Sequence, residues 1–121
     1  MITAVRHAVL PIHDQERALK FYTEKLGFKV TADILFEGCP QRWIELKIPE
    51  GETYIILYTF DEHKEMIGKN SNIVFTCKDV VSTTDQLKAK GVEIVEGPVE
   101  RSWGKYSIFK DSEGNSFCIS S

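Results

Sequence analysis

Two neighbouring segments of the chain carry side chains that could bind or transform a small molecule. Alternation in residues 42–48 and 53–60 sorts them into two faces. One face is aliphatic, with Ile44, Leu46, Ile55 and Leu57, and suits a helix-covered core. The other carries Trp43, Glu45, Lys47, Tyr54, Ile56 and Tyr58. Glu45 is the acid of this aromatic face, where it could act as a general base or pair with a cationic ligand. An exposed glutamate on an edge strand explains the same pattern equally well.

His7 and Cys118 are the other side chains with possible chemistry. His7 lies in an apolar segment, where a histidine forms either a hydrogen-bonded pocket wall or a metal ligand. Cys118 could be a nucleophile activated by His7, but no third group that would orient the pair is apparent, which favours an inert thiol. The chain has three cysteines and no C-x-x-C pair, so neither a disulfide framework nor a zinc knuckle is indicated. His13 and His63 are expected in solvent.

The first half of the chain predicts the order strand, helix, strand, strand, strand. Residues 3–12 are rich in β-branched side chains, and Asp14 can cap a helix that Gly27 ends. Strand-like segments at 27–33, 42–48 and 53–60 follow, the last two joined by a turn sequence at 49–52.

The second half repeats this plan. Asn72 precedes the capping Asp79 by seven residues, as His7 precedes Asp14, and Gly91 ends the second helix. Val81, Thr84 and Leu87 or Lys88 are expected along one side of that helix. The repeat predicts an α+β fold in which two βαβββ modules form curved mixed sheets around a central cleft, with helices on the convex faces. A single domain over residues 1–121 would comprise a module at 1–60, a polar linker at 61–71 and a module at 72–121.

Composition and charge exclude several classes of function. Among 121 residues, 15 Lys and Arg oppose 18 Asp and Glu, a net charge of −3, and the basic residues are scattered, so we expect no nucleic-acid partner. The apolar runs are only a few residues long, so no membrane association is expected. The first residues, MITAVRHAVL, lack the organisation of a signal peptide, which favours a cytoplasmic location.

Three stretches resemble the vicinal oxygen chelate superfamily, the family of glyoxalases, bleomycin-resistance proteins and extradiol dioxygenases. HAVLPI at 7–12, followed by Asp14 and by FYTEKLGF at 21–28, is similar to its opening strand and helix. WG at 103–104 and FKDSEGN at 109–115 are similar to its closing segment. The resemblance implies the same duplicated fold, and it places Trp103 near the mouth of the cleft.

The resemblance also implies where a divalent metal would bind in the metal-dependent members. Those positions fall on His7, Ile56, Asn72 and Cys118, and this set lacks the donors of a zinc or nickel site. We therefore expect no metal and no cofactor, but a homodimer that binds a small, partly aromatic or cationic molecule in a mildly acidic cleft. The expected ligand-binding residues are His7, Trp43, Glu45, Tyr54, Ile56, Tyr58, Asn72, Trp103 and Cys118.

Two alternatives remain open. The chain could be a lyase or isomerase of the glyoxalase type, with zinc, nickel or manganese stabilising an enediolate and with Glu45 as ligand or base. It could also have a vestigial cleft and act through an oligomer surface.

Overall fold

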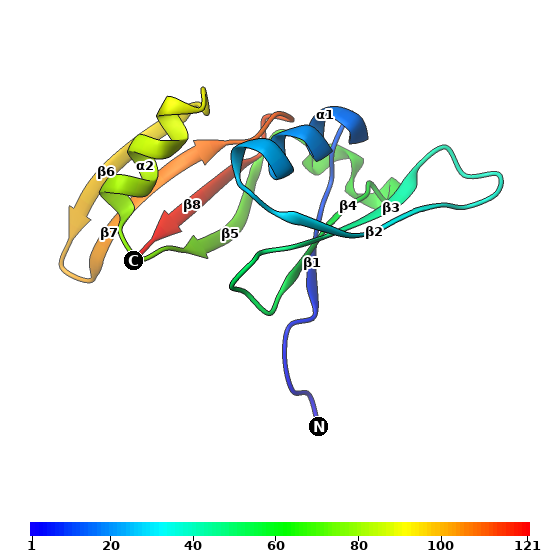
Figure 1. The fold of residues 1–121 in the computed structure, drawn as a ribbon, viewed down its shortest axis with the longest axis horizontal. Coiled ribbons are helices and arrows are strands. Elements are labelled where there is room, and N and C mark those ends of the chain that lie inside the picture. The colour runs from blue at the N-terminus through cyan, green and yellow to red at the C-terminus, as the bar shows by residue number, and fades with distance from the viewer. The chain divides into compact units, whose positions relative to one another are not determined.

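The computed structural model describes residues 1–121, and its backbone repeats one βαβββ plan in two units, Met1–Ile67 and Gly68–Ser121 (Figure 1). Each unit contains a four-stranded mixed sheet with helical segments. The predicted fold class, α+β with two βαβββ modules, is confirmed. The unit boundary lies inside the predicted linker.

The first unit orders its strands β1-β4-β3-β2, and we call this sheet A. β1 pairs with β4 in parallel, and the other two pairs are antiparallel. Its elements are β1 (His7–Leu10), α1 (Gln15–Lys20), a π-helical turn η1 (Phe21–Lys25), β2 (Lys29–Leu35), β3 (Arg42–Lys47), β4 (Tyr54–Leu57) and a 3-10 helix η2 (Asp61–Met66). β1 is shorter than the predicted strand because residues 1–6 are exposed and have no regular structure.

The core of the first unit lies between sheet A and its helical segment. Ile44, Leu46, Ile55 and Leu57 are buried as predicted, with Ala18 and Tyr22. Burying side chains of this kind stabilises the fold by roughly 1.5–3 kcal/mol each. Asp14 caps α1 by accepting from the Arg17 backbone N–H at 3.0 Å. The predicted single helix widens into a π-helical turn at Phe21, where Thr23 Oγ1 donates to the Leu19 carbonyl and competes with the regular ladder.

The second unit orders its strands β5-β8-β7-β6, and we call this sheet B. Its elements are β5 (Asn70–Thr76), α2 (Val80–Ala89), β6 (Ile94–Arg101), β7 (Gly104–Lys110) and β8 (Ser116–Ser120). β5 therefore starts inside the predicted linker. On the expected helix face, Thr84 and Leu87 are buried as predicted, but the assignment of Val81 is wrong, because α2 buries Val80 and leaves Val81 41% exposed.

The β7–β8 turn is built on a buried aspartate. Asp111 Oδ1 accepts from the backbone N–H groups of Glu113 and Asn115 at 2.8 and 2.9 Å. Asn115 Oδ1 accepts from the Gly68 N–H at 2.7 Å, which ties the start of the unit to this turn. Asp111 therefore caps its own turn.

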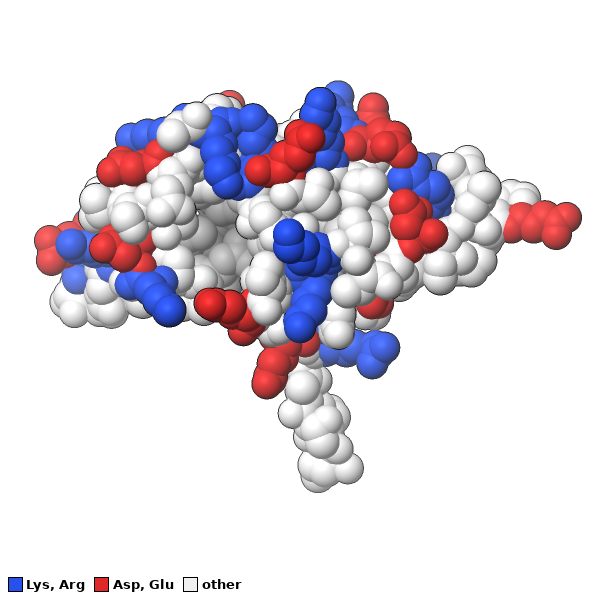
Figure 2. Space-filling view, viewed as in Figure 1, with Lys and Arg blue, Asp and Glu red and all other residues white.

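Charged side chains of both signs are interspersed over the face shown in Figure 2. None of the helices has the length and apolar character needed to cross a membrane.

Candidate functional site

The face of sheet A that points away from the buried core is the candidate site, and we call it the open face. Directly paired residues on neighbouring strands point to the same face of a sheet. Strand register therefore divides the open face into rows of paired residues, one from each strand, and we call each row a level. The first level, which we call the donor row, takes one residue from each strand: Lys29, Lys47, Tyr54 and His7. The second level takes Ala32, Glu45, Ile56 and Val9. Trp43 and Tyr58 follow beyond it.

An aromatic cluster covers the far end of the open face. The ring of Trp43 lies 5.5 Å from Tyr58 and 6.5 Å from Phe60, measured between centroids. Tyr58 and Phe60 are 5.0 Å apart, and Phe60 contacts His63 edge-on at 5.9 Å. Such ring pairs contribute about 0.5–1.5 kcal/mol each beyond the area that they bury. The cluster leaves its members half-buried, so a planar ligand can reach it.

Ile56 is fully buried although it lies on the open face. His7 on β1 and Trp43 on β3 approach to 6.1 Å, and β4 with Ile56 runs between these two strands. The two rings therefore close over Ile56. This arrangement makes Ile56 the apolar base of the aromatic cluster rather than an exposed wall.

Glu45 lies half-buried at the centre of the open face, between the donor row and the aromatic cluster. Its Oε1 accepts a hydrogen bond from Thr31 Oγ1 at 2.9 Å. Thr31 stands at the register shift between Val30 and Ala32, which turns its side chain toward β3. Glu45 thus keeps one oxygen engaged and the other open to a ligand.

Cys39 and Tyr58 form a contact that the sequence analysis missed. The Cys39 Sγ lies 3.5 Å from the Tyr58 hydroxyl. This hydrogen bond lowers the pKa of the Cys39 thiol and raises the pKa of Tyr58. No sequence signal pointed to the pair, since Cys39 lies in the loop between β2 and β3. Phe60 continues the alternation of Tyr54 and Tyr58, and could have been predicted, whereas the expectation of a solvated His63 is wrong because that ring packs on Phe60.

Three of the predicted ligand-binding residues lie in the second unit. Trp103 is 64% exposed and stacks on Tyr106 at 5.8 Å with 16° between the ring planes. Tyr106 donates to Glu96 Oε1 at 2.9 Å, and Arg101 lies 5.8 Å from the Tyr106 ring centre. Cys118 is half-buried, and burial followed by the nearby Glu96 raises the pKa of its thiol.

Asn72 departs from the strand position expected for it. Its φ is 60°, and the pairing of β5 with β8 shifts register between Asn70 and Val74. The Asn72 side chain is exposed, and its backbone N–H is held by Asn70 Oδ1 at 2.9 Å. A left-handed residue interrupts the alternation of side chains, so Asn72 differs from its counterpart His7 in backbone as well as side chain.

The residues at the four family positions do not fit a divalent metal. Ile56 has no donor atom and is buried, and Asn72 offers only a neutral amide. His7 and Cys118 carry usual donors, but two protein ligands are fewer than the three or four that a zinc or nickel site needs. Within neither unit do three His, Cys, Asp or Glu side chains lie close enough to share an ion.

A groove of about 680 Å³ lies at the same end of sheet A as the aromatic cluster, lined by its sequence neighbours Arg42, Thr59 and Lys64, and the sequence analysis missed it. Its polar lining is occupied by structural contacts. Gln15 exchanges hydrogen bonds with the backbone of Arg42, and Gln41 does the same with Thr59. The Arg42 guanidinium pairs with Asp33 at 2.8 Å and with Glu16 at 2.5 Å. These contacts join the ends of β1, β3 and β4, so the groove has a structural explanation.

The model of the Glyoxalase/Bleomycin resistance protein/Dioxygenase superfamily matches residues 4–119, and the chain belongs to that superfamily. The uncharacterised protein YetH of Bacillus subtilis (strain 168) is 33% identical over 119 residues, covering 98% of both chains.

Two further comparisons concern proteins whose descriptions name a function. TnmS3, an antibiotic binding protein from Streptomyces sp. CB03234, superposes with a TM-score of 0.83 at 27% identity, covering 98% of this chain and 95% of that one. A probable chloroplastic lactoylglutathione lyase of Arabidopsis thaliana is 30% identical over 118 residues, covering 92% of this chain and 33% of the lyase.

Proposed function

We propose that the chain binds a small, partly aromatic molecule on the open face of sheet A and needs no metal ion to do so. One observation carries the proposal. At a position where metal-dependent relatives would place a ligand, this chain buries Ile56 beneath the His7 and Trp43 rings. A planar ligand can extend that aromatic cluster by stacking, with Glu45 beside it as a polar contact.

The similarity to an antibiotic binding protein supports a binding role. The lyase alternative needs a divalent ion to stabilise an enediolate, which requires three or four protein donors. Only His7 and Cys118 among the family positions carry a donor of the usual kind. Glu45 could add its open oxygen, but within the first unit no three His, Cys, Asp or Glu side chains lie close enough to share an ion.

A thermal-shift screen of aromatic small molecules tests the proposal. The protein is treated with EDTA, dialysed, and screened with and without zinc, nickel and manganese. We expect some compounds to raise the melting temperature equally in both conditions, because binding to the native state stabilises it by mass action. Stabilisation that requires metal would contradict the proposal, as would one tightly bound ion per chain that His7→Ala releases.

We also propose that the protein is a homodimer. Two-fold dimers are the commonest assembly, and the apolar side chains Ile34, Leu35 and Phe36 at the tip of the β2–β3 hairpin are exposed. Light scattering of the purified protein should give twice the mass of 13.8 kDa. A monomer would contradict this expectation.

A further inference from the structure

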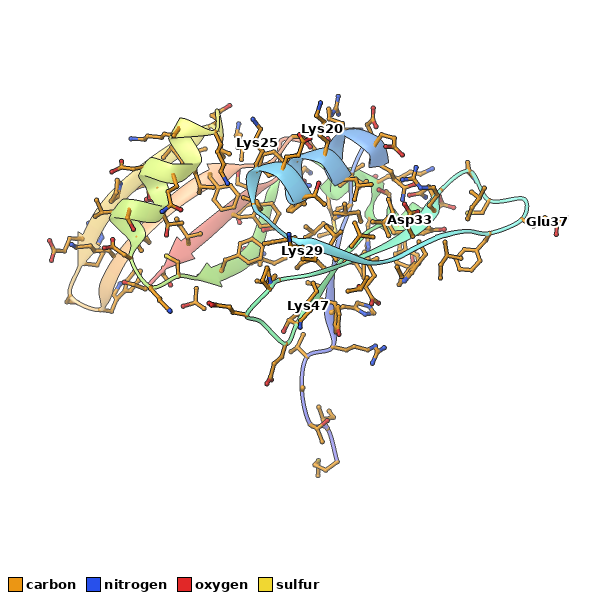
Figure 3. The ribbon with its side chains drawn as sticks, in the orientation of Figure 1. Lys20, Lys25, Lys29, Asp33, Glu37 and Lys47 are labelled. Atoms are coloured by element: carbon orange, nitrogen blue, oxygen red, sulfur yellow. The ribbon has the colours of Figure 1, made fainter.

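Lys29 and Lys47 form an unfavourable pair within the donor row. They stand directly opposite each other on β2 and β3, and Figure 3 shows both on this hairpin. Like charges at such positions destabilise an antiparallel pair. Neither ammonium group has an ion-pair partner within the first unit. Functional sites are where proteins keep such locally unfavourable arrangements, here two like charges with no acidic partner.

Two other cations of the first unit, Arg42 and Lys64, do form ion pairs. Arg42 pairs with Asp33 and Glu16, and Lys64 lies 3.1 Å from Asp61. Glu45, the carboxylate one level from the lysines, takes its hydrogen bond from Thr31 instead. The positive charge of the donor row is therefore left for a group outside the chain.

The other two residues of the donor row, Tyr54 and His7, can also donate hydrogen bonds to an anionic group. Tyr54 is the cross-strand partner of Lys47, and His7 is the partner of Tyr54. All four side chains of the row can donate a hydrogen bond, and together they span the width of the sheet. Lysines with neighbouring hydroxyl and imidazole groups are a recurrent way to bind carboxylate and phosphate oxygens.

The aromatic cluster begins beside this row. The His7 ring belongs to the donor row and lies 6.1 Å from the Trp43 ring. One level of the face along a strand corresponds to two residues, roughly 7 Å, so Trp43 lies two levels, roughly 14 Å, from Lys47 along β3. The flexible lysine side chains shorten this span, so an oxyanion at the lysines and a planar ring on Trp43 fit a molecule with an extended, fused ring system.

From this juxtaposition we infer that the ligand is an aromatic anion, whose carboxylate or similar oxyanion binds Lys29 and Lys47 while its ring packs on the aromatic cluster. The inference rests on the proposed function and adds the sign and position of the ligand's charge. The unit's charge pattern, not the net charge of −3, selects the ligand.

Two probes of the same shape test the inference. The Kd values of 2-naphthoate, an anion, and 2-naphthamide, its neutral analogue, are measured by calorimetry at low ionic strength. We expect the native protein to bind naphthoate about 1.5- to fivefold more tightly, the range that an exposed charge pair provides. Lys29→Gln/Lys47→Gln should remove this preference by weakening naphthoate alone, and added salt should reduce it in the native protein.

Lys20→Gln/Lys88→Gln is the matched control. It removes the same charge from the two helical segments and should keep the naphthoate preference. Equal binding of both probes to the native protein would overturn the inference and leave the proposed function standing. An equal loss in the control would also overturn it, since net charge would then explain the preference. If neither probe bound, the proposed function and the inference would fail together.

Discussion

The open faces of the two sheets share one backbone plan but treat their polar groups differently. On sheet B, Tyr106 donates to Glu96 and packs against Arg101, so the polar groups satisfy one another. On sheet A, Lys29 and Lys47 face each other with no acidic partner. The two surfaces therefore differ in the pairing of their polar groups, and the unpaired lysines of sheet A are what the proposed ligand would contact.

The two units also differ in how they hold the first strand. β1 keeps regular parallel register with β4 from His7 to Leu10. β5 loses register with β8 around Asn72, whose φ is positive. A side chain on a regular strand has a defined direction, and this is the condition for a preorganised site. The comparison therefore places the better-ordered candidate surface in the first unit.

The largest expected effect on stability comes from replacing a glycine in the β6–β7 hairpin, compared with a glycine in the β2–β3 hairpin. A Cβ on Gly97 would lie 2.7 Å from the Tyr106 carbonyl oxygen and from Ser107 Oγ, at a φ of +100°. Gly97→Ala should therefore lower the free energy of unfolding by about 3 kcal/mol or more, measured by urea denaturation. Gly38→Ala, at a φ of +75° with open space around it, should cost only about 1 kcal/mol. Equal costs would show that the β6–β7 hairpin is no tighter than its counterpart.

The two tryptophans give the next largest difference. Trp43 contacts three rings and helps to bury Ile56, whereas Trp103 is mostly exposed and has one ring partner. Trp43→Ala should cost about 2 kcal/mol of stability and at least about tenfold in naphthamide affinity. Trp103→Ala should cost less than about 1 kcal/mol and weaken binding less. The reverse order would move the ligand surface to the second unit.

Cysteine reactivity sharpens the comparison further. The Tyr58 hydroxyl lowers the pKa of Cys39, while burial and then Glu96 raise the pKa of Cys118. Below both pKa values the thiolate fraction is larger for Cys39, so iodoacetamide should modify it several-fold faster, and the difference should close as the pH rises. Peptide mapping by mass spectrometry measures both rates. Tyr58→Phe should slow the modification of Cys39, whereas the control Tyr54→Phe should leave that rate unchanged. If Cys39 reacted equally fast in Tyr58→Phe, the Tyr58 hydroxyl would not be what lowers the pKa of Cys39.

The smallest expected effect tests the charge pairing itself. Lys29→Glu replaces repulsion by attraction across β2 and β3, and should raise the free energy of unfolding by about 0.2–1 kcal/mol. Tyr106→Phe removes the hydrogen bond to Glu96 on sheet B and should lower the free energy of unfolding by about 0.5–1.5 kcal/mol. Denaturation at low salt measures both changes. A loss of stability in Lys29→Glu would mean that the lysine pair is not strained in the free protein.

Local patterns in the sequence predicted much of this protein. Alternation assigned Ile44 and Leu57 to the covered face and Trp43 and Tyr58 to the open one, because side chains of a strand alternate whatever packs against them. Asp14 and Asp79 were predicted as helix caps, since a cap acts within three residues. The error at Val81 arose because a short helix with a weak apolar stripe fits two neighbouring registers.

By itself, then, the sequence determined the duplicated βαβββ plan, the sorting of side chains onto faces and the replacement of usual metal donors by Ile56 and Asn72 at two of the four family positions. Only the tertiary structure decided that His7 and Trp43 close over Ile56, that Cys39 reaches Tyr58 and that Lys29 faces Lys47. The physical reason is the range of the forces involved. Periodicity and capping act within a few residues, whereas these contacts depend on strand register and sheet twist between distant segments.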